Sequence, residues 1–150
     1  MKLSTILTPK RINLNLKSTT KAGVLEELVR LLRLTPPAQK ALLQTLQARE
    51  DLGSTGIGKG VAIPHCRSLV ASEVLVAVGR SQKGINFKSM DRKRARLFFL
   101  VVAPPLGDPG DYLVVLGNIV QVARLMSADR RLKGIRTAAQ FIKVVKELEQ

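Results

Sequence analysis

The chain contains one histidine, His65, which lies at the end of a glycine-rich segment that begins near Arg49. Between these two residues stand the hydroxyl residues Ser54 and Thr55 and the glycines at positions 56, 58 and 60. An imidazole titrates close to neutral pH, so its neutral form can act as a nucleophile without a metal. His65 is therefore the first candidate for chemistry in this sequence.

Each residue type in this segment suits a histidine that carries a phosphoryl group. Phosphoryl transfer depends on positioning and on stabilising the charge of the phosphoryl oxygens. Arg49 would supply a permanently charged, forked donor, and Ser54 and Thr55 would supply hydroxyls. The backbone N–H groups from Gly56 onward would form an anion-binding nest, and Pro64 would hold the chain rigid beside the imidazole.

The same residues also have ordinary structural explanations when they are taken one at a time. An isolated histidine is more often a surface or structural residue, and Arg49 would suit the C-terminal end of a helix. Ser54 and Thr55 are common turn residues. Sequence order alone does not overturn these explanations.

Two other chemical interpretations of the segment are weaker. Residues 53–59 match the start of the P-loop pattern for nucleotides, but Gly60 stands where that pattern needs a serine or threonine for magnesium. The order of elements is also reversed, because this segment follows a predicted helix. Cys66 beside His65 suggests a Cys–His nucleophilic pair, but neighbouring residues on an extended chain point to opposite faces.

Apolar patterns predict the elements that must position these residues. Alternation and continuous apolar runs indicate strands, and apolar residues at helical spacing indicate helices. The three glycines of the segment are expected to exclude regular structure there. We expect strands over 12–16, 61–63, 74–78 and 97–103, and helices from about 18, from 35 towards 49, over 111–126 and over 137–149. Interleaved helices and buried strands favour a mixed sheet covered by helices.

Composition limits the classes of function. A chain of 150 residues has the size of one domain, and it contains no apolar run near the roughly 20 residues of a membrane span. Its N-terminal apolar patch is too short for a signal peptide. One cysteine, Cys66, excludes an internal disulfide and cysteine-based zinc motifs. We therefore expect a cytoplasmic protein without membrane insertion, metal or cofactor.

The charge balance favours acidic partners. Lysine and arginine number 25 against 11 aspartates and glutamates, which gives a net charge of +14 at pH 7. A basic cluster over 92–96 keeps a nucleic-acid-binding module as a rival interpretation. Aromatic residues make up only 3%, and Phe98 and Phe99 lie inside an apolar strand, so no exposed rings are expected to stack on bases. Nucleic acid is therefore the disfavoured partner, and a solvated basic surface remains an alternative.

The segment Arg49-Glu50, Gly53-Ser-Thr-Gly-Ile-Gly and Val-Ala-Ile-Pro-His65 resembles the active-site signature of type-2 EIIA domains. These domains form the fructose, mannitol and nitrogen-regulatory branch of the bacterial phosphoenolpyruvate-dependent phosphotransferase system. The resemblance continues through residues 84–91 and 116–148, so it covers nearly the whole chain. It implies a single α/β domain of residues 1–150, with a central mixed β-sheet flanked by helices and no cofactor.

The resemblance also implies roles for the candidate residues. His65 would accept a phosphoryl group from an HPr-like phosphocarrier protein, and Arg49 would stabilise it, with phosphate-binding support from Ser54, Thr55 and Gly56. The family often carries a second active-site histidine, and Val115 stands at that position in our alignment. Cys66 replaces a glycine that commonly follows the phosphorylated histidine.

The missing second histidine, and the lack of an attached IIB or membrane domain, favour a regulatory phosphocarrier of the nitrogen type. Such a protein would signal through phosphorylation-dependent binding to targets such as a sensor kinase or a transporter component. A IIA component that passes phosphate to a sugar-specific IIB is the main alternative. A docking domain that has lost phosphotransfer and a basic nucleic-acid-binding module are the others.

Overall fold

The computed structural model describes residues 2–107 and 109–149. Within them, six strands form one mixed sheet in the order β1-β5-β6-β3-β2, and β4 pairs with β6 beside this path. The strands are β1 (Ile12–Asn13), β2 (Gly56–Gly58), β3 (Val61–Ala62), β4 (His65–Arg67), β5 (Leu75–Ile85) and β6 (Ala95–Ala103). The helices are α1 (Leu3–Ile6), α2 (Lys21–Arg30), α3 (Pro36–Leu52), α4 (Pro109–Ala128) and α5 (Ala138–Leu148), with short 3-10 turns η1 (Pro9–Arg11) and η2 (Arg130–Gly134).

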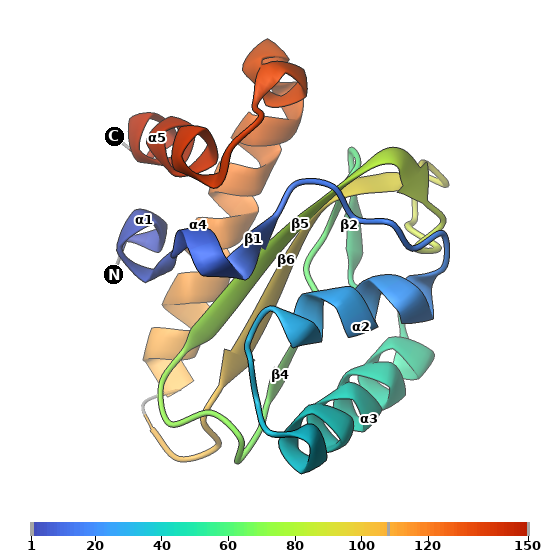
Figure 1. Cartoon of the computed structure of the whole chain (residues 1–150), viewed down its shortest axis with the longest axis vertical. Helices are drawn as coiled ribbons and strands as arrows, with labels where there is room; N and C mark the ends of the chain where they lie inside the picture. Colours follow the sequence, from blue (N-terminus) through green and yellow to red (C-terminus); the bar gives the residue numbers. More distant parts are fainter. Residues whose placement is uncertain (1, 108, 150) are drawn as a thin grey trace.

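Helices cover both faces of the sheet (Figure 1). On one face, α1, α4 and α5 enclose a core that includes Phe99 and Val101 of β6. On the other face, α2 and α3 enclose a second core that includes Phe98 and Leu100. Successive strand residues point to opposite faces, so the continuous apolar run of β6 supplies both cores. Among the described residues, no helix combines the length and apolar character that crossing a membrane requires.

Threonine side chains define where three helices begin. Thr20, Thr35 and Thr137 each accept a hydrogen bond from the backbone N–H three residues later, at the starts of α2, α3 and α5. A cap of this kind satisfies an otherwise unpaired helical N–H and contributes about 1 kcal/mol. Thr35 followed by Pro36 was predicted to begin a helix, and this prediction is confirmed.

β6 holds the site-bearing edge of the sheet in place. It pairs with β5 in the antiparallel direction and with both β3 and β4 in the parallel direction. Val61 of β3 lies opposite Leu97, and His65 of β4 lies opposite Val101. Residues 63–64 belong to neither strand, but the Val101 N–H donates to the Pro64 carbonyl oxygen at 2.9 Å, so the chain keeps its register on β6 up to the histidine.

The structure confirms the predicted α/β class with a mixed sheet flanked by helices. The strand expected over 12–16 is shorter, because only Ile12–Asn13 pairs with β5. The expectation that the glycines exclude regular structure is wrong: Gly56–Gly58 forms β2, which pairs with β3 as a hairpin. The helix α1 and the strand β4 were not anticipated.

One glycine of β5 allows α2 to approach the sheet closely. A Cβ atom at Gly79 would lie 2.7 Å from Leu16 Cδ1 and 2.9 Å from Leu28 Cδ2. We expect Gly79→Ala to lower the free energy of unfolding by about 2 kcal/mol, because the extra methyl group overpacks this core. Urea unfolding followed by circular dichroism measures the change.

Gly117 on α4 provides the matched control. A Cβ atom there would meet no heavy atom within 4 Å. Gly117→Ala should therefore leave stability unchanged or raise it by about 0.5 kcal/mol, since alanine favours the helix. Equal destabilisation by both substitutions would contradict the close approach of α2 to β5.

Candidate functional site

His65 is the first residue of β4, and its imidazole is anchored by the main chain. Its Nδ1 lies 2.7 Å from the carbonyl oxygen of Ile63. A carbonyl oxygen can only accept a hydrogen bond, so Nδ1 must carry the proton in this contact. In the neutral imidazole, Nε2 then holds the lone pair and is the nucleophilic nitrogen.

Arg49 occupies the last turn of α3 and faces the same site. Its Nη1 donates to the carbonyl oxygen of Gly53, 2.9 Å away, at the point where the helix ends. This bond holds the guanidinium over the beginning of the glycine-rich segment. Within the described part of the chain, its other N–H groups make no hydrogen bond, so they remain free for an anion.

A cavity of about 250 Å³ brings together residues from α3, β2, β4 and α4. All five predicted site residues line it: Arg49, Ser54, Thr55, Gly56 and His65. The remaining walls are apolar and come from Ile57, Ile63, Leu116 and Val120. The structure therefore assembles one concave site from the segment that the sequence indicated.

The two predicted hydroxyls are used to hold the backbone of the loop. Ser54 Oγ donates to the carbonyl oxygen of Phe87 and accepts from the backbone N–H of Gly56 at 3.0 Å. Thr55 donates both its hydroxyl and its N–H to the carboxylate of Glu50. Either hydroxyl would reach a phosphate only by exchanging one of these bonds.

The predicted anion nest is not formed by the glycine-rich backbone. The N–H groups of Thr55 and Gly56 are already bound by side chains, and the N–H of Lys59 donates to Asp91 Oδ2 at 2.8 Å. The turn itself has positive φ at Gly58 (85°), Lys59 (55°) and Gly60 (82°), so it needs its glycines to reverse direction. Because β3 rather than a helix follows, the structure also excludes the P-loop interpretation.

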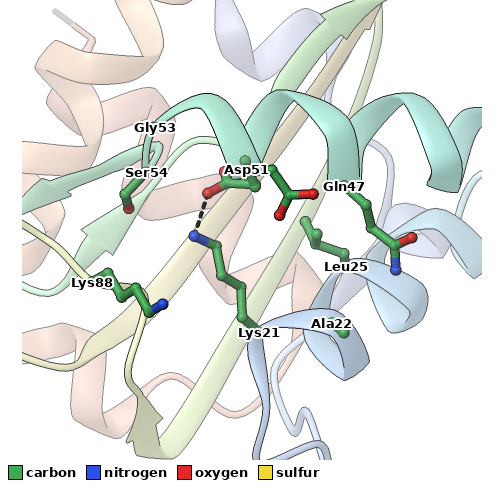
Figure 2. Close-up of a pocket in the computed structure, with 9 residues that line it drawn as sticks. Lys21, Ala22, Leu25, Gln47, Asp51, Gly53, Ser54 and Lys88 are labelled. Carbon is green, nitrogen blue, oxygen red and sulfur yellow. Dashed lines mark ion pairs between the residues drawn. The ribbon is translucent and has the colours of Figure 1, made fainter.

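A buried ion pair lies behind the loop. Glu50 is only 7% exposed, and its Oε2 lies 2.6 Å from Lys21 Nζ. Figure 2 shows Lys21 reaching from α2 across a pocket of about 450 Å³ toward the end of α3. The Lys21 ammonium also lies 4.8 Å from the centre of the Phe87 ring, so a cation–π contact supports the ion pair. Sequence reasoning treated Glu50 only as part of the signature.

The helix α4 contributes an aromatic ring beside His65, and β4 contributes a second cation. The ring of Tyr112 lies 6.4 Å from that of His65 between centroids, and Arg67 Cζ lies 5.1 Å from the Tyr112 centroid. Burial raises the pKa of the Tyr112 hydroxyl to about 12, so it stays neutral near pH 7. The sequence reasoning missed both residues, although Arg67 is two positions after His65 and therefore on the same face of β4.

Val115, which stands at the position expected for a second histidine, lies away from the site. Val115 is 2% exposed and belongs to the core between α4 and the sheet, so it does not line the site. The residues of α4 that do line it are Leu116 and Val120. None of these three side chains can accept a phosphoryl group or a proton.

Cys66 is separated from the chemistry, as its place on the strand predicts. It packs against the core on the α2 and α3 side, and burial raises the pKa of its thiol to about 11. The Cys–His pair is therefore excluded as a nucleophilic unit near neutral pH. Among the described residues, no group of three or more histidine, cysteine, aspartate or glutamate side chains could hold a metal ion.

Comparisons with known proteins show the family of the chain. A family model described as phosphoenolpyruvate-dependent sugar phosphotransferase system, EIIA 2, matches residues 5–149. A nitrogen regulatory protein from Bradyrhizobium diazoefficiens is 32% identical over 146 residues, which cover 97% of this chain and 95% of the relative. The crystal structure of nitrogen regulatory protein IIA-Ntr from Neisseria meningitidis superposes with a TM-score of 0.85 at 28% identity, covering 95% of this chain and 98% of that one.

A sugar-system relative is similar over a smaller region. The fructose-specific EIIABC component of Bacillus subtilis is 35% identical over 105 residues. The match covers 69% of this chain but only 16% of that relative. The chain therefore corresponds to a small part of the EIIABC component and to nearly all of the nitrogen regulatory protein.

The buried ion pair behind the loop gives a stability prediction. We expect Glu50→Gln to lower the free energy of unfolding by about 3 kcal/mol, because it leaves Lys21 without its partner and weakens the bonds to Thr55. The control is Glu26→Gln, which breaks an exposed pair with Arg30 and should cost less than about 0.5 kcal/mol. Similar losses in the two variants, measured by urea unfolding, would show that Glu50 is not a buried anchor.

The raised thiol pKa gives a prediction about reactivity and pH. At pH 8 the thiolate fraction of Cys66 should be roughly a hundredfold below that of an exposed cysteine, so iodoacetamide should react correspondingly slowly. The rate should rise about tenfold per pH unit until the pH approaches the thiol pKa of about 11. The same protein unfolded in urea serves as the control. A native rate at pH 8 equal to the unfolded rate would refute the prediction.

Proposed function

The chain belongs to the EIIA 2 family of the phosphoenolpyruvate-dependent sugar phosphotransferase system, and we propose that His65 is its phosphoryl acceptor. The donor is an HPr-like phosphohistidine carrier. Nε2 of His65 attacks the phosphorus, the bond from phosphorus to the nitrogen of the carrier breaks, and the carrier imidazole keeps that electron pair. The observation that supports this most directly is the contact of 2.7 Å between Nδ1 and the Ile63 carbonyl, which leaves Nε2 unprotonated.

The same contact stabilises the product of the transfer. As Nε2 bonds to phosphorus, positive charge develops on the imidazole and the Nδ1 proton becomes more acidic. The Ile63 carbonyl is already aligned with that proton and needs no rearrangement, which is the property expected of a preorganised catalytic dipole. The acceptor therefore works without a carboxylate beside the imidazole.

Arg49 stabilises the charge on the transferring phosphoryl oxygens. Its bond to Gly53 orients the guanidinium and leaves further donors for the oxygens. Ser54, Thr55 and Gly56 support the phosphate site by fixing the wall of the cavity, through the bonds to Phe87 and Glu50. Arg67, held over Tyr112, adds positive charge on the same face of β4.

The phosphorylated and free forms serve a regulatory purpose by binding different target proteins, such as a sensor kinase or a transporter component. A phosphoryl group adds nearly two negative charges to a surface whose net charge is +14, which is a large local change. The extensive likeness to the Bradyrhizobium nitrogen regulatory protein supports this role. The domain, residues 1–150, acts in the cytoplasm and needs no cofactor.

Transfer to a sugar-specific IIB component is the second candidate, favoured by the identity to the fructose-specific EIIABC component. Against it, the part of α4 that lines the site offers Leu116 and Val120, and the chain has no other histidine. Onward transfer would therefore rely on His65 alone. A docking domain without phosphotransfer would share the geometry but never acquire phosphate.

A reconstituted relay tests the acceptor. The protein mixed with enzyme I, HPr and phosphoenolpyruvate should gain one acid-labile phosphoryl group, located at His65 by mass spectrometry. His65→Ala should gain none, and Arg49→Ala should slow the transfer by about a hundredfold or more, because it removes a charged donor from the transition state. Arg124→Ala removes an exposed cation of α4 outside the site and should transfer at the normal rate.

The outcomes separate the candidates. Absence of phosphate on the native protein, or equal labelling of His65→Ala, would refute the acceptor and leave the docking domain. The phosphorylated protein is then mixed with a fructose-type IIB component. Transfer of its phosphate as fast as from a sugar-specific IIA would refute the regulatory role and support the role in sugar transport.

A further inference from the structure

A second concave surface lies along the seam between the β2–β3 hairpin and α4, beyond the His65 cavity. It consists of two adjoining cavities of about 880 and 600 Å³, which share Lys59, Gly60, Arg96, Ser127 and Ala128. We call it the basic groove, and its cationic residues are Lys59, Arg80, Lys93, Arg94, Arg96, Arg130 and Lys133. On β6 its edge is Leu97, four residues from the partner of His65, which corresponds to roughly 13 Å along the strand.

The positive charge of the basic groove is only partly compensated: Asp91 accepts from the backbone N–H groups of Lys59 and Lys93, and its charge interacts with Lys93. None of its seven cationic residues forms an ion pair in the part of the chain that the structure describes. The one carboxylate lining it, Asp129, is bound by Arg131, with Nη2 and Oδ2 2.9 Å apart. A concave surface lined by one sign of charge concentrates the field and attracts anions.

Arg80 is a built part of this surface rather than a solvated surface cation. It is 6% exposed, and its guanidinium donates to the carbonyl oxygens of Leu14, Leu132 and Ile135 at 3.1, 2.8 and 2.8 Å. The three carbonyl groups satisfy hydrogen bonds of the guanidinium but do not neutralise its positive charge. Burial lowers the pKa of Arg80. A buried cation without a counter-ion raises the free energy of the empty protein, and an anion in the groove would offset this.

The non-charged lining indicates what kind of anion fits. Ala128 and Leu132 provide aliphatic surface between the cations, and Gln82 and Ser127 provide hydrogen-bonding groups. No aromatic side chain is among the residues that line either cavity. Nucleic acid bases would therefore find no ring to stack on, and a polyphosphate chain would bring no apolar group for Leu132 and Ala128.

We propose that the basic groove binds an acidic segment of a partner protein, in which aspartate or glutamate alternates with aliphatic residues. The site is separate from phosphoryl transfer and goes beyond the proposed function. At physiological salt, charges are screened over about 8 Å, so a phosphoryl group on His65 leaves binding in the groove nearly unchanged. The protein thus has one contact surface that responds to phosphorylation and another that does not.

A peptide titration tests the proposal. The probe is a fluorescein-labelled peptide in which glutamate pairs alternate with leucines. The control is a neutral peptide of the same sequence with glutamine in place of glutamate. Fluorescence anisotropy at low ionic strength should show binding of the acidic peptide at least about tenfold tighter than of the neutral one, and weakening as salt is added. Amide chemical shifts should move at residues 59–60 and 127–133 rather than around His65.

Matched double variants separate the groove from the net charge. Arg130→Gln with Lys133→Gln removes two exposed cations of the groove and should weaken peptide binding roughly five- to tenfold. Lys40→Gln with Lys143→Gln removes two exposed cations elsewhere and should change the affinity less than about twofold. Thermal melting confirms that both variants fold.

Several results would overturn the proposal. These are no binding at low ionic strength, equal binding of the neutral peptide, or equal losses in the two double variants. Displacement of the peptide by inorganic polyphosphate or a single-stranded oligonucleotide at lower charge concentration would assign the groove to a phosphate polymer instead. His65→Ala, which abolishes phosphorylation, should bind the peptide normally. The binding proposal can therefore be refuted without refuting the phosphoryl-acceptor proposal, and the reverse.

Discussion

The buried carboxylate of Glu50 is the constraint on which the site depends. A carboxylate removed from water is costly unless it is paired, and Lys21 and Thr55 supply its partners from α2 and from the start of β2. These bonds fix the path by which the chain leaves α3 and enters the hairpin. Arg49, on the same helical turn, is thereby held next to the loop, and the cavity that contains His65 takes its shape from that path.

The phosphoryl transfer that we propose needs little acid–base machinery. In that proposal a neutral imidazole nitrogen attacks phosphorus and arginine neutralises the charge of the phosphoryl oxygens. The protein supplies orientation: one carbonyl dipole for the imidazole, one for the guanidinium, and a closely packed loop between them. The side chains of α4 that line the cavity, Leu116 and Val120, are apolar and offer no second acceptor.

Local patterns predicted the fold class and the principal strands and helices, because these follow from the spacing of apolar residues. The five candidate residues that line the His65 cavity came from one continuous segment. They did not predict β2, since glycines usually break strands and the close approach of Ser89 to Gly56 depends on tertiary contact. The partner of the Ser54 hydroxyl lies 33 residues away, at Phe87, and no local pattern records it. The burial of Val115 was not predicted either, because the sequence alone does not show which face of α4 turns toward the core.

The anchoring of His65 by the main chain has a consequence for substitutions around the site. The Ile63 carbonyl receives the imidazole, while the next carbonyl, that of Pro64, accepts from the Val101 N–H and keeps the chain on β6. Because the anchoring group is a peptide carbonyl, substitutions of surrounding side chains do not delete it. The surface around the histidine can therefore be redesigned for a new partner without changing which ring nitrogen is anchored.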